Sequence, residues 1–243
     1  MALLVAASLL PAAVVAGEFA VTPIRMELGA GTRTGAFTVR NEGKDPLPLQ
    51  VRGMTWSQDA AGQDQYEDAK DLVYFPRVLS VEPGQEAVIR VGIRMPPADA
   101  EKTYRVFIEE LPAPADAEGK RGAALTFLVR FGAPVFVRPA ATTDALLLEG
   151  LGAARGQATF SMHNAGNQHQ VVENIVVRGL ATDGQELFAV ALTDRYLLAG
   201  TRKRYSAPIP REACGRLASL SAEATTDKAK ASGRMAVAGA ACD

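Results

Sequence analysis

The chain has 243 residues, of which 48% are hydrophobic and 22% charged, so it can bury the core of one large domain or two smaller ones. Its formal net charge of −1 provides no basic excess to neutralise phosphates, which argues against a nucleic-acid-binding protein. Two His and two Cys leave little material for metal or imidazole chemistry.

Residues 1–16 predict a cleaved secretory signal peptide. The apolar run is too short to span a bilayer and is broken by Pro11, and Val14 and Ala16 suit a signal peptidase, so we place cleavage at or near Ala16. No Lys or Arg precedes Arg25, so the usual basic start is missing. An atypical signal and a true start further upstream both stay open, and a buried N-terminal helix of a cytosolic protein is the alternative. We expect an exported, soluble mature protein without a membrane-spanning segment.

Short alternating strands separated by turns fill residues 17–138. V-T-P-I-R-M-E-L alternates Ile24, Met26 and Leu28 against more polar positions, and A-F-T-V-R-N and L-P-L-Q-V-R-G-M-T-W predict two further strands. S-Q-D-A-A-G-Q-D-Q-Y-E-D-A-K predicts a polar loop. L-V-Y-F-P-R-V-L-S-V predicts a strand broken at Pro76, before E-A-V-I-R-V-G-I and T-Y-R-V-F-I-E-E-L alternate again. About seven short strands without a helix-length pattern favour an antiparallel sandwich of immunoglobulin type.

The last strand of this half, within 123–139, is apolar on both faces. Its odd positions share one face at a spacing of two, and Leu128 makes the other face partly apolar. The odd positions are Leu125, Phe127, Val129 and Phe131. Such a strand is either buried in a sheet or covered by a partner, because an uncovered one promotes aggregation. We expect another protein to cover it.

The strand pattern restarts after Arg138-Pro139, which predicts a second immunoglobulin-like β-domain over residues 139–243. The very short linker would hold the two domains at a fixed angle and create a cleft between them. In the Ala-rich tail, A-E-A-T-T-D-K-A-K-A permits a helix, but Cys242 favours a terminal strand near Cys214. A disulfide between the two cysteines suits an exported chain and would add about 2–4 kcal/mol, and a reactive thiol is the alternative.

We expect no catalytic or metal site. His163 and His169 flank N-A-G-N-Q without a third ligand, and this loop predicts a hairpin whose Asn and Gly take positive φ. The acidic residues form no acid–base pair, and no nucleophile motif or phosphate-binding glycine loop is present. The run Arg202, Lys203 and Arg204 predicts an exposed basic face. We therefore expect no enzyme activity and no cofactor.

Taken in order, these segments resemble the periplasmic pilus chaperones of the chaperone–usher pathway. The most specific are P-G-Q-E-A-V-I-R-V, Y-R-V-F-I-E-E-L-P and the V-F-V-R-P-A linker, with H-N-A-G-N-Q-H and Y-L-L-A-G-T-R in the second half. G-A-P-V-F-V and N-A-G-N-Q-H are similar to the branch that serves archaic or spore-coat-type pili. The resemblance covers the whole mature chain.

The resemblance implies that the protein binds a pilus subunit whose β-sandwich lacks its last strand. The chaperone lends that strand: backbone hydrogen bonds join the subunit's sheet while alternate side chains fill its open groove. By residue-for-residue match the inserted side chains are Leu125, Phe127 and Val129, with Ala123 as a further candidate. Each large one would contribute about 1.5–3 kcal/mol of apolar burial. The alternative is that these residues belong to the chaperone's own core.

The resemblance also implies a cationic anchor for the subunit's C-terminal carboxylate in the interdomain cleft. Arg25 matches the family's cleft arginine, and an arginine can hold a carboxylate through two hydrogen bonds. Pro134 stands where the family has a second cation, a Lys. Either Arg105 in T-Y-R-V-F-I supplies the second charge, which we prefer, or Arg25 acts alone. The alternative for each arginine is an ordinary solvated strand residue.

As a chaperone of this kind, the protein would work in the periplasm on pilus subunits. It would complete the fold of each subunit, prevent premature polymerisation and deliver the subunit to an outer-membrane usher without a nucleotide. It would bind no nucleic acid and insert into no membrane, and self-association of the free protein stays open. The alternative is an exported structural or adhesion protein built from two immunoglobulin-like domains, which a stable homo-oligomer formed through the apolar strand would favour. An exported hydrolase is a third alternative and would need clustered catalytic residues.

Overall fold

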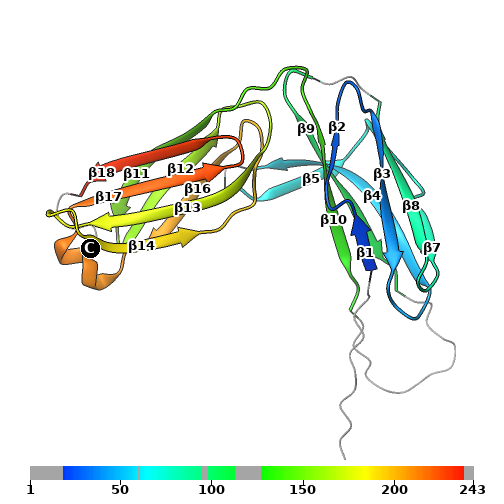
Figure 1. Cartoon of the computed structure of the whole chain (residues 1–243), viewed down its shortest axis with the longest axis horizontal. Helices are drawn as coiled ribbons and strands as arrows, with labels where there is room; N and C mark the ends of the chain where they lie inside the picture. Colours follow the sequence, from blue (N-terminus) through cyan, green and yellow to red (C-terminus); the bar gives the residue numbers. More distant parts are fainter. Residues whose placement is uncertain (1–18, 60, 95–97, 113–126, 238–243) are drawn as a thin grey trace, which may run out of the picture.

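The computed structural model describes residues 19–59, 61–94, 98–112 and 127–237, which form two β-sandwiches (Figure 1). The predicted all-β fold of two sandwich domains is confirmed. Within the described ranges the only helix is the six-residue 3-10 helix η1 (Arg211–Arg216). A helix that is long and apolar enough to cross a membrane was sought in the same ranges, and none was found.

The first sandwich packs a four-stranded sheet, in the order β1-β3-β8-β6, against a six-stranded sheet, in the order β2-β10-β9-β4-β5 with β7 paired to β4. Its strands are β1 (Phe19–Thr22), β2 (Met26–Leu28), β3 (Thr34–Asn41), β4 (Leu47–Gln58), β5 (Asp64–Asp68), β6 (Leu72–Phe75), β7 (Val78–Val81), β8 (Glu86–Ile93), β9 (Lys102–Glu110) and β10 (Arg130–Val137). β2 and β10 run parallel, whereas the other pairs described in this sandwich run antiparallel.

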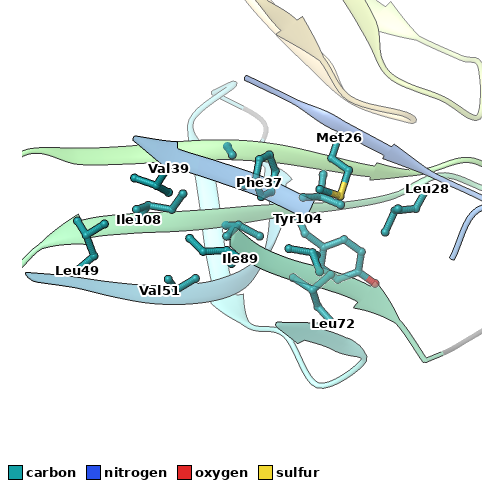
Figure 2. Packing of buried hydrophobic residues seen from close by; sticks show 14 of the residues in the cluster. Met26, Leu28, Phe37, Val39, Leu49, Val51, Leu72, Ile89, Tyr104 and Ile108 are labelled. Carbon is teal, nitrogen blue, oxygen red and sulfur yellow. The ribbon is translucent and has the colours of Figure 1, made fainter. Parts of the chain in front are cut away.

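The core of this sandwich lies between its two sheets (Figure 2). Phe37 and Ile89 project into it from one sheet, and Leu49, Tyr104 and Ile108 project from the other. Each of these side chains is fully buried or nearly so. The alternation predicted in β8 is confirmed, because Ile89 and the two odd residues that follow it on the strand are buried.

The N-terminal segment makes two strands and not one. β1 pairs with β3 in the smaller sheet and β2 pairs with β10 in the larger sheet, so the chain crosses from one sheet to the other between Thr22 and Met26. Pro23 lies in this crossing and cannot donate a ladder hydrogen bond. The prediction is right for Met26 and Leu28, which are buried, and wrong for Ile24, which is 61% exposed.

The polar segment predicted as a loop contains a strand. β4 continues to Gln58, and β5 (Asp64–Asp68) folds back onto it through a turn in which the Asp59 carboxylate accepts hydrogen bonds from the backbone N–H groups of Ala61 and Gln63. Gly62 takes a φ of 76° in this turn. Every residue of β5 is exposed, so the strand has no apolar alternation that could reveal it in the sequence.

The second sandwich contains a three-stranded sheet, β11-β12-β16, and a five-stranded sheet, β14-β13-β17-β18 with β15 paired to β13. Its strands are β11 (Leu146–Ala154), β12 (Gln157–Asn164), β13 (Gln170–Leu180), β14 (Glu186–Leu192), β15 (Tyr196–Leu197), β16 (Arg202–Pro208), β17 (Ser219–Thr226) and β18 (Lys230–Ala236). The tail thus ends in two strands, and the helix that the sequence permitted there is absent.

The N-A-G-N-Q loop is not the hairpin that the sequence predicts. It joins β12 to β13, which lie in different sheets, and none of its residues has a positive φ. Gly166 is required for space, because an added Cβ would lie 2.4 Å from the carbonyl oxygen of Thr143. The loop therefore packs tightly on the segment that joins the two sandwiches.

Asn167, in the same loop, connects three parts of the molecule. Its side-chain amide donates to the carbonyl oxygens of Asp99 in the first sandwich and Ala141 in the linker, both at 2.8 Å. Its carbonyl oxygen accepts from the backbone N–H of Glu101 and its side-chain oxygen accepts from the backbone N–H of Thr143, both at 2.8 Å. These bonds hold the two sandwiches at the angle seen in Figure 1.

Candidate functional site

One edge of β10 is only partly covered. β10 pairs with β9 from Arg130 to Val137 but with β2 only from Val135 to Val137, so within the described ranges Arg130–Pro134 have no strand on their outer side. Pro134 suits this place, since proline is tolerated where a strand lacks a neighbour. Unpaired N–H and C=O groups on such an edge are a template for pairing with another chain.

On the face of β10 that carries the odd-numbered residues, side chains are buried at the C-terminal end of the strand and become more exposed toward its N-terminal end. Ala133, Val135 and Val137 are buried in the core of the first sandwich, and Phe131 packs against it partly buried. Before the strand, Val129 is half-buried and Phe127 is 50% exposed. Apolar side chains on this face thus extend past the core of the first sandwich.

Two of the predicted donor-strand residues can be placed and two cannot. Phe127 and Val129 precede β10, whereas Ala123 and Leu125 lie outside the described residues. Leu128, predicted to make the opposite face partly apolar, is 48% exposed. The strand is shorter than the sequence suggests, because it begins at Arg130.

Glu110 ends the pairing between β9 and the segment before β10. Its backbone N–H donates to the carbonyl oxygen of Val129 at 2.9 Å, and its carboxylate accepts from the Val129 N–H at 3.3 Å. The next residue, Arg130, is bound to Glu109 at 2.7 Å and lies over the Phe107 ring. The hydrogen bonding between β9 and this segment therefore stops at Val129. Among the described residues, no strand pairs with Phe127 and Leu128, which precede it.

An aromatic cluster joins the outer face of the larger sheet to the second sandwich. Trp56 and Phe136 from the first sandwich pack with Tyr196 and Leu198 from the second, and all four are buried. Phe136 also stacks on His169, with ring centroids 3.6 Å apart. Trp56 is the only tryptophan of the chain, so its fluorescence reports directly on this interface.

Two polar contacts reinforce the cluster. Glu101 accepts hydrogen bonds from the backbone N–H of His169 and contacts its Nδ1, both at 2.8 Å, in a buried setting. The Gln58 amide donates to the Tyr196 carbonyl at 3.0 Å and accepts from the Leu198 N–H at 3.1 Å. The side-chain amide of Gln58 therefore bonds the backbone at β15 in the way that the peptide group of a neighbouring strand would.

Arg105 lies beside this cluster in a pocket of about 470 Å³ between the two sandwiches. Its guanidinium stacks on Trp56, with Cζ 3.8 Å from the ring centroid, and Nη1 donates to the Gly132 carbonyl of β10 at 2.9 Å. Asp64 lies 3.9 Å from Nη2, and the Nε atom is buried without a partner among the described residues. Burial and a hydrogen bond to Asp64 raise the pKa of the neighbouring Tyr66 hydroxyl. Arg105 is thus a partly buried, incompletely compensated cation.

Arg25 lies on the far side of β10 from Arg105. Met26 pairs with Val135, so Arg25, one residue earlier, lies beside Pro134. Pro134 pairs on its other side with Arg105. The backbones of Arg25 and Arg105 are therefore about two strand spacings, or 10 Å, apart. Arg25 is exposed and pairs with Glu27 at 3.8 Å, and it does not line the pocket that contains Arg105. The structure places the two arginines on neighbouring parts of one sheet without bringing them into contact.

The remaining sequence candidates are the two histidines and the two cysteines. The two histidines, His163 and His169, have different surroundings. His169 is part of the interface between the sandwiches, whereas His163 contacts Arg202 at 3.5 Å. A search of these ranges for metal-binding clusters of His, Cys, Asp and Glu finds none. Cys214 lies in η1, but Cys242 lies outside the described residues, so their disulfide stays a prediction.

One sequence motif that predicts a hairpin belongs in fact to the interface between the sandwiches. H-N-A-G-N-Q-H stood out as a motif, but its role is to bind the linker and the first sandwich through Asn167 and His169. Gln58, at the end of β4, gave no signal at all. Its partners are 138 and 140 residues away in the sequence.

Comparison with known proteins assigns the family. Residues 18–143 match the family described as pili and flagellar-assembly chaperone, PapD N-terminal domain. This match covers more than half of the chain, so the protein belongs to this family of pilus-assembly chaperones. The family and the fold point to a chaperone role without catalysis. A comparison with curated proteins found no match.

Solved structures share the fold at low sequence identity. A chain of the CsuC–CsuE chaperone–tip adhesion subunit pre-assembly complex, from archaic Csu pili of Acinetobacter baumannii, matches with a TM-score of 0.62 and 17% identity over 88% of this chain and 98% of that one. The Pseudomonas aeruginosa CupB2 chaperone matches with a TM-score of 0.55 and 18% identity over 90% and 100%. A chain of the Salmonella enterica SafA pilin–SafB chaperone complex matches with a TM-score of 0.56 and 16% identity over 93% and 99%.

The interface predicts a fluorescence phenotype for Gln58→Ala. Removing the amide deletes two hydrogen bonds between the sandwiches, so we expect solvent to reach Trp56, with a red-shifted emission maximum and stronger acrylamide quenching. Gln65→Ala is the matched control, because this amide lies on the same hairpin but binds only Asp59. An unchanged Trp56 emission in Gln58→Ala would show that Gln58 does not hold the interface.

Proposed function

We propose that this protein is a periplasmic chaperone that binds pilus subunits by donor-strand complementation. It completes the subunit's fold, keeps the subunit from polymerising prematurely and delivers it to an outer-membrane usher. Membership of the pilus chaperone family supports the class of activity, and two of the solved relatives are described as complexes with a tip adhesion subunit or a pilin. Assignment to the archaic branch is part of the proposal, since the Csu, CupB2 and Saf structures match to a similar degree.

The single observation that carries the proposal is the uncovered edge of β10. Among the described residues no strand pairs with Arg130–Pro134 on one side, and the apolar side chains of Phe127 and Val129 extend beyond the core. A subunit sandwich that lacks a strand needs both features, namely a backbone edge with which to pair and alternate apolar side chains for its groove. Ala123 and Leu125 complete the proposed donor segment.

We assign the anchor for the subunit's C-terminal carboxylate to Arg25 and Arg105. Their strands flank Pro134, so two long side chains on one sheet face can converge on a carboxylate placed between them. Among the described residues, Arg25 has one ion pair, with Glu27 at the surface, which contributes little stability and is readily exchanged for another carboxylate. The anchor would set the register of the subunit's last strand along β10.

Three further assignments belong to this proposal. Residues 1–16 are the export signal, residues 17–138 the subunit-binding domain and residues 139–243 the second domain, with the boundary falling between β10 and β11. Cys214 and Cys242 form a disulfide that fixes the C-terminal end. Periplasmic localisation is part of the proposal and is supported by the predicted signal and by membership of the family.

Serine substitution of the donor residues tests the central assignment. We expect a Leu125/Phe127/Val129→Ser variant to lose co-purification with subunits from periplasm, because each lost apolar side chain costs about 1.5–3 kcal/mol of groove burial. The matched control is Phe75/Val78→Ser, which removes two apolar side chains that are 71% and 62% exposed on other strands. The probes are the small secreted proteins encoded beside this gene, each co-expressed with the chaperone.

The outcome also separates the two functions. Loss of the subunit from a folded donor variant, but not from the control, supports donor-strand complementation. If wild type carries no subunit and instead forms a stable homo-oligomer that the donor substitutions dissolve, the protein is a structural or adhesion protein.

Substitution of Arg25 tests the anchor. We expect Arg25→Ala to abolish subunit capture and to leave the urea midpoint unchanged, since its ion pair with Glu27 lies at the surface. Arg40→Ala is the control, because Arg40 is similarly exposed and pairs with Glu86 at 3.7 Å in the other sheet. Full capture by Arg25→Ala would refute the assignment of Arg25.

A further inference from the structure

The pocket that contains Arg105 holds more positive charge than its own carboxylates neutralise. Five charged residues line it: Arg105, Arg195, Lys203, Asp64 and Asp194. Lys203 and Asp194 form a close pair at 2.9 Å, and Asp64 approaches Arg105 only to 3.9 Å. For Arg195, no carboxylate of the described residues lies within ion-pair distance. The pocket therefore carries one uncompensated cation.

Arg195 comes from the second sandwich and points its charge at the same ring as Arg105. Its Cζ lies 5.4 Å from the centroid of Tyr196, and that of Arg105 lies 6.0 Å from the same centroid. The backbone of Arg195 is fixed, because its carbonyl accepts the Val172 N–H at 2.9 Å, while its side chain is exposed. Two guanidinium groups from different domains thus approach one aromatic side chain.

Both guanidinium groups have donors to spare. In Arg105, Nη1 is bound to Gly132, but the distance of 3.9 Å from Nη2 to Asp64 is too long for a hydrogen bond. In Arg195, only the contact with the Tyr196 ring occupies the guanidinium among the described residues. A ligand that suits these donors is an anion with two acceptor oxygens, such as a carboxylate.

We propose that Arg195 belongs to the anchor and that the subunit's C-terminal carboxylate, which Arg25 and Arg105 approach from the first domain, is also bound by Arg195 of the second domain. This inference rests on the proposed chaperone function. Arg195 then adds, from the second domain, a third cation to the two that Arg25 and Arg105 supply on the first. Cations from both domains offset the desolvation of a carboxylate better than those of one domain alone, and charge-assisted hydrogen bonds from both sides would fix its position. A ligand held in this way binds only when the domains keep their observed angle.

Charge removal at Arg195 tests the inference. We expect Arg195→Gln to reduce capture of the co-expressed neighbouring secreted proteins at least about tenfold and Arg195→Lys to recover most of it, because the lysine restores the charge. Arg204→Gln is the control, an exposed arginine of the same domain that does not line the pocket. Trp56 emission, measured on each variant, verifies that the interface is intact.

The outcomes distinguish this inference from the proposed function. Equal capture by Arg195→Gln and Arg204→Gln would remove Arg195 from the anchor, while the chaperone function stands as long as wild type captures a subunit and the donor-strand variant does not. If Arg195→Gln and Arg195→Lys lose capture equally while Trp56 emission is unchanged, the positive charge of Arg195 is not what binds the subunit, and the inference is wrong. If wild type captures none of the candidates, the proposed function fails and this inference fails with it.

Discussion

An edge strand that is apolar on one face has two needs, since its backbone groups require hydrogen-bond partners and its side chains are more stable away from water. β10 meets both needs in its second half, where β2 covers its edge and the core covers its odd-numbered face. Neither need is fully met in its first half, Arg130–Pro134, or in the segment Phe127–Val129 that precedes the strand. The protein keeps this half in place through β9, which pairs with β10 along its whole length.

The interdomain interface and the open edge are physically connected through Arg105. This side chain stacks on Trp56, which is buried against the second sandwich, and it also binds the carbonyl of Gly132 on the uncovered part of β10. The angle between the domains, fixed by Gln58, His169 and Asn167, therefore determines what surrounds Arg105. The proposed carboxylate anchor and donor strand would need such a fixed relation, because the anchor would set the register in which the strand pairs.

Apolar periodicity predicted most of the fold, because the buried residues of β8 and the second half of β10 alternate along short strands. It missed β5, whose residues are all exposed, and it failed at Ile24, where Pro23 interrupts the ladder and the chain changes sheets. The family resemblance supplied Arg25, Arg105 and the donor residues. Neither periodicity nor resemblance revealed Gln58, whose partners in the other domain are 138 and 140 residues away, or Arg195, which shares a pocket with Arg105 only in the folded protein.

Hydrogen exchange at the uncovered edge of β10 is the most direct test of the account. The backbone amides of Arg130–Ala133 would be compared in the free chaperone and in its complex with a co-purified subunit. The account predicts that amides facing away from β9 become strongly protected in the complex, because the subunit's strand pairs with them. A stable complex that leaves these amides exchanging as fast as in the free protein would contradict donor-strand complementation through β10.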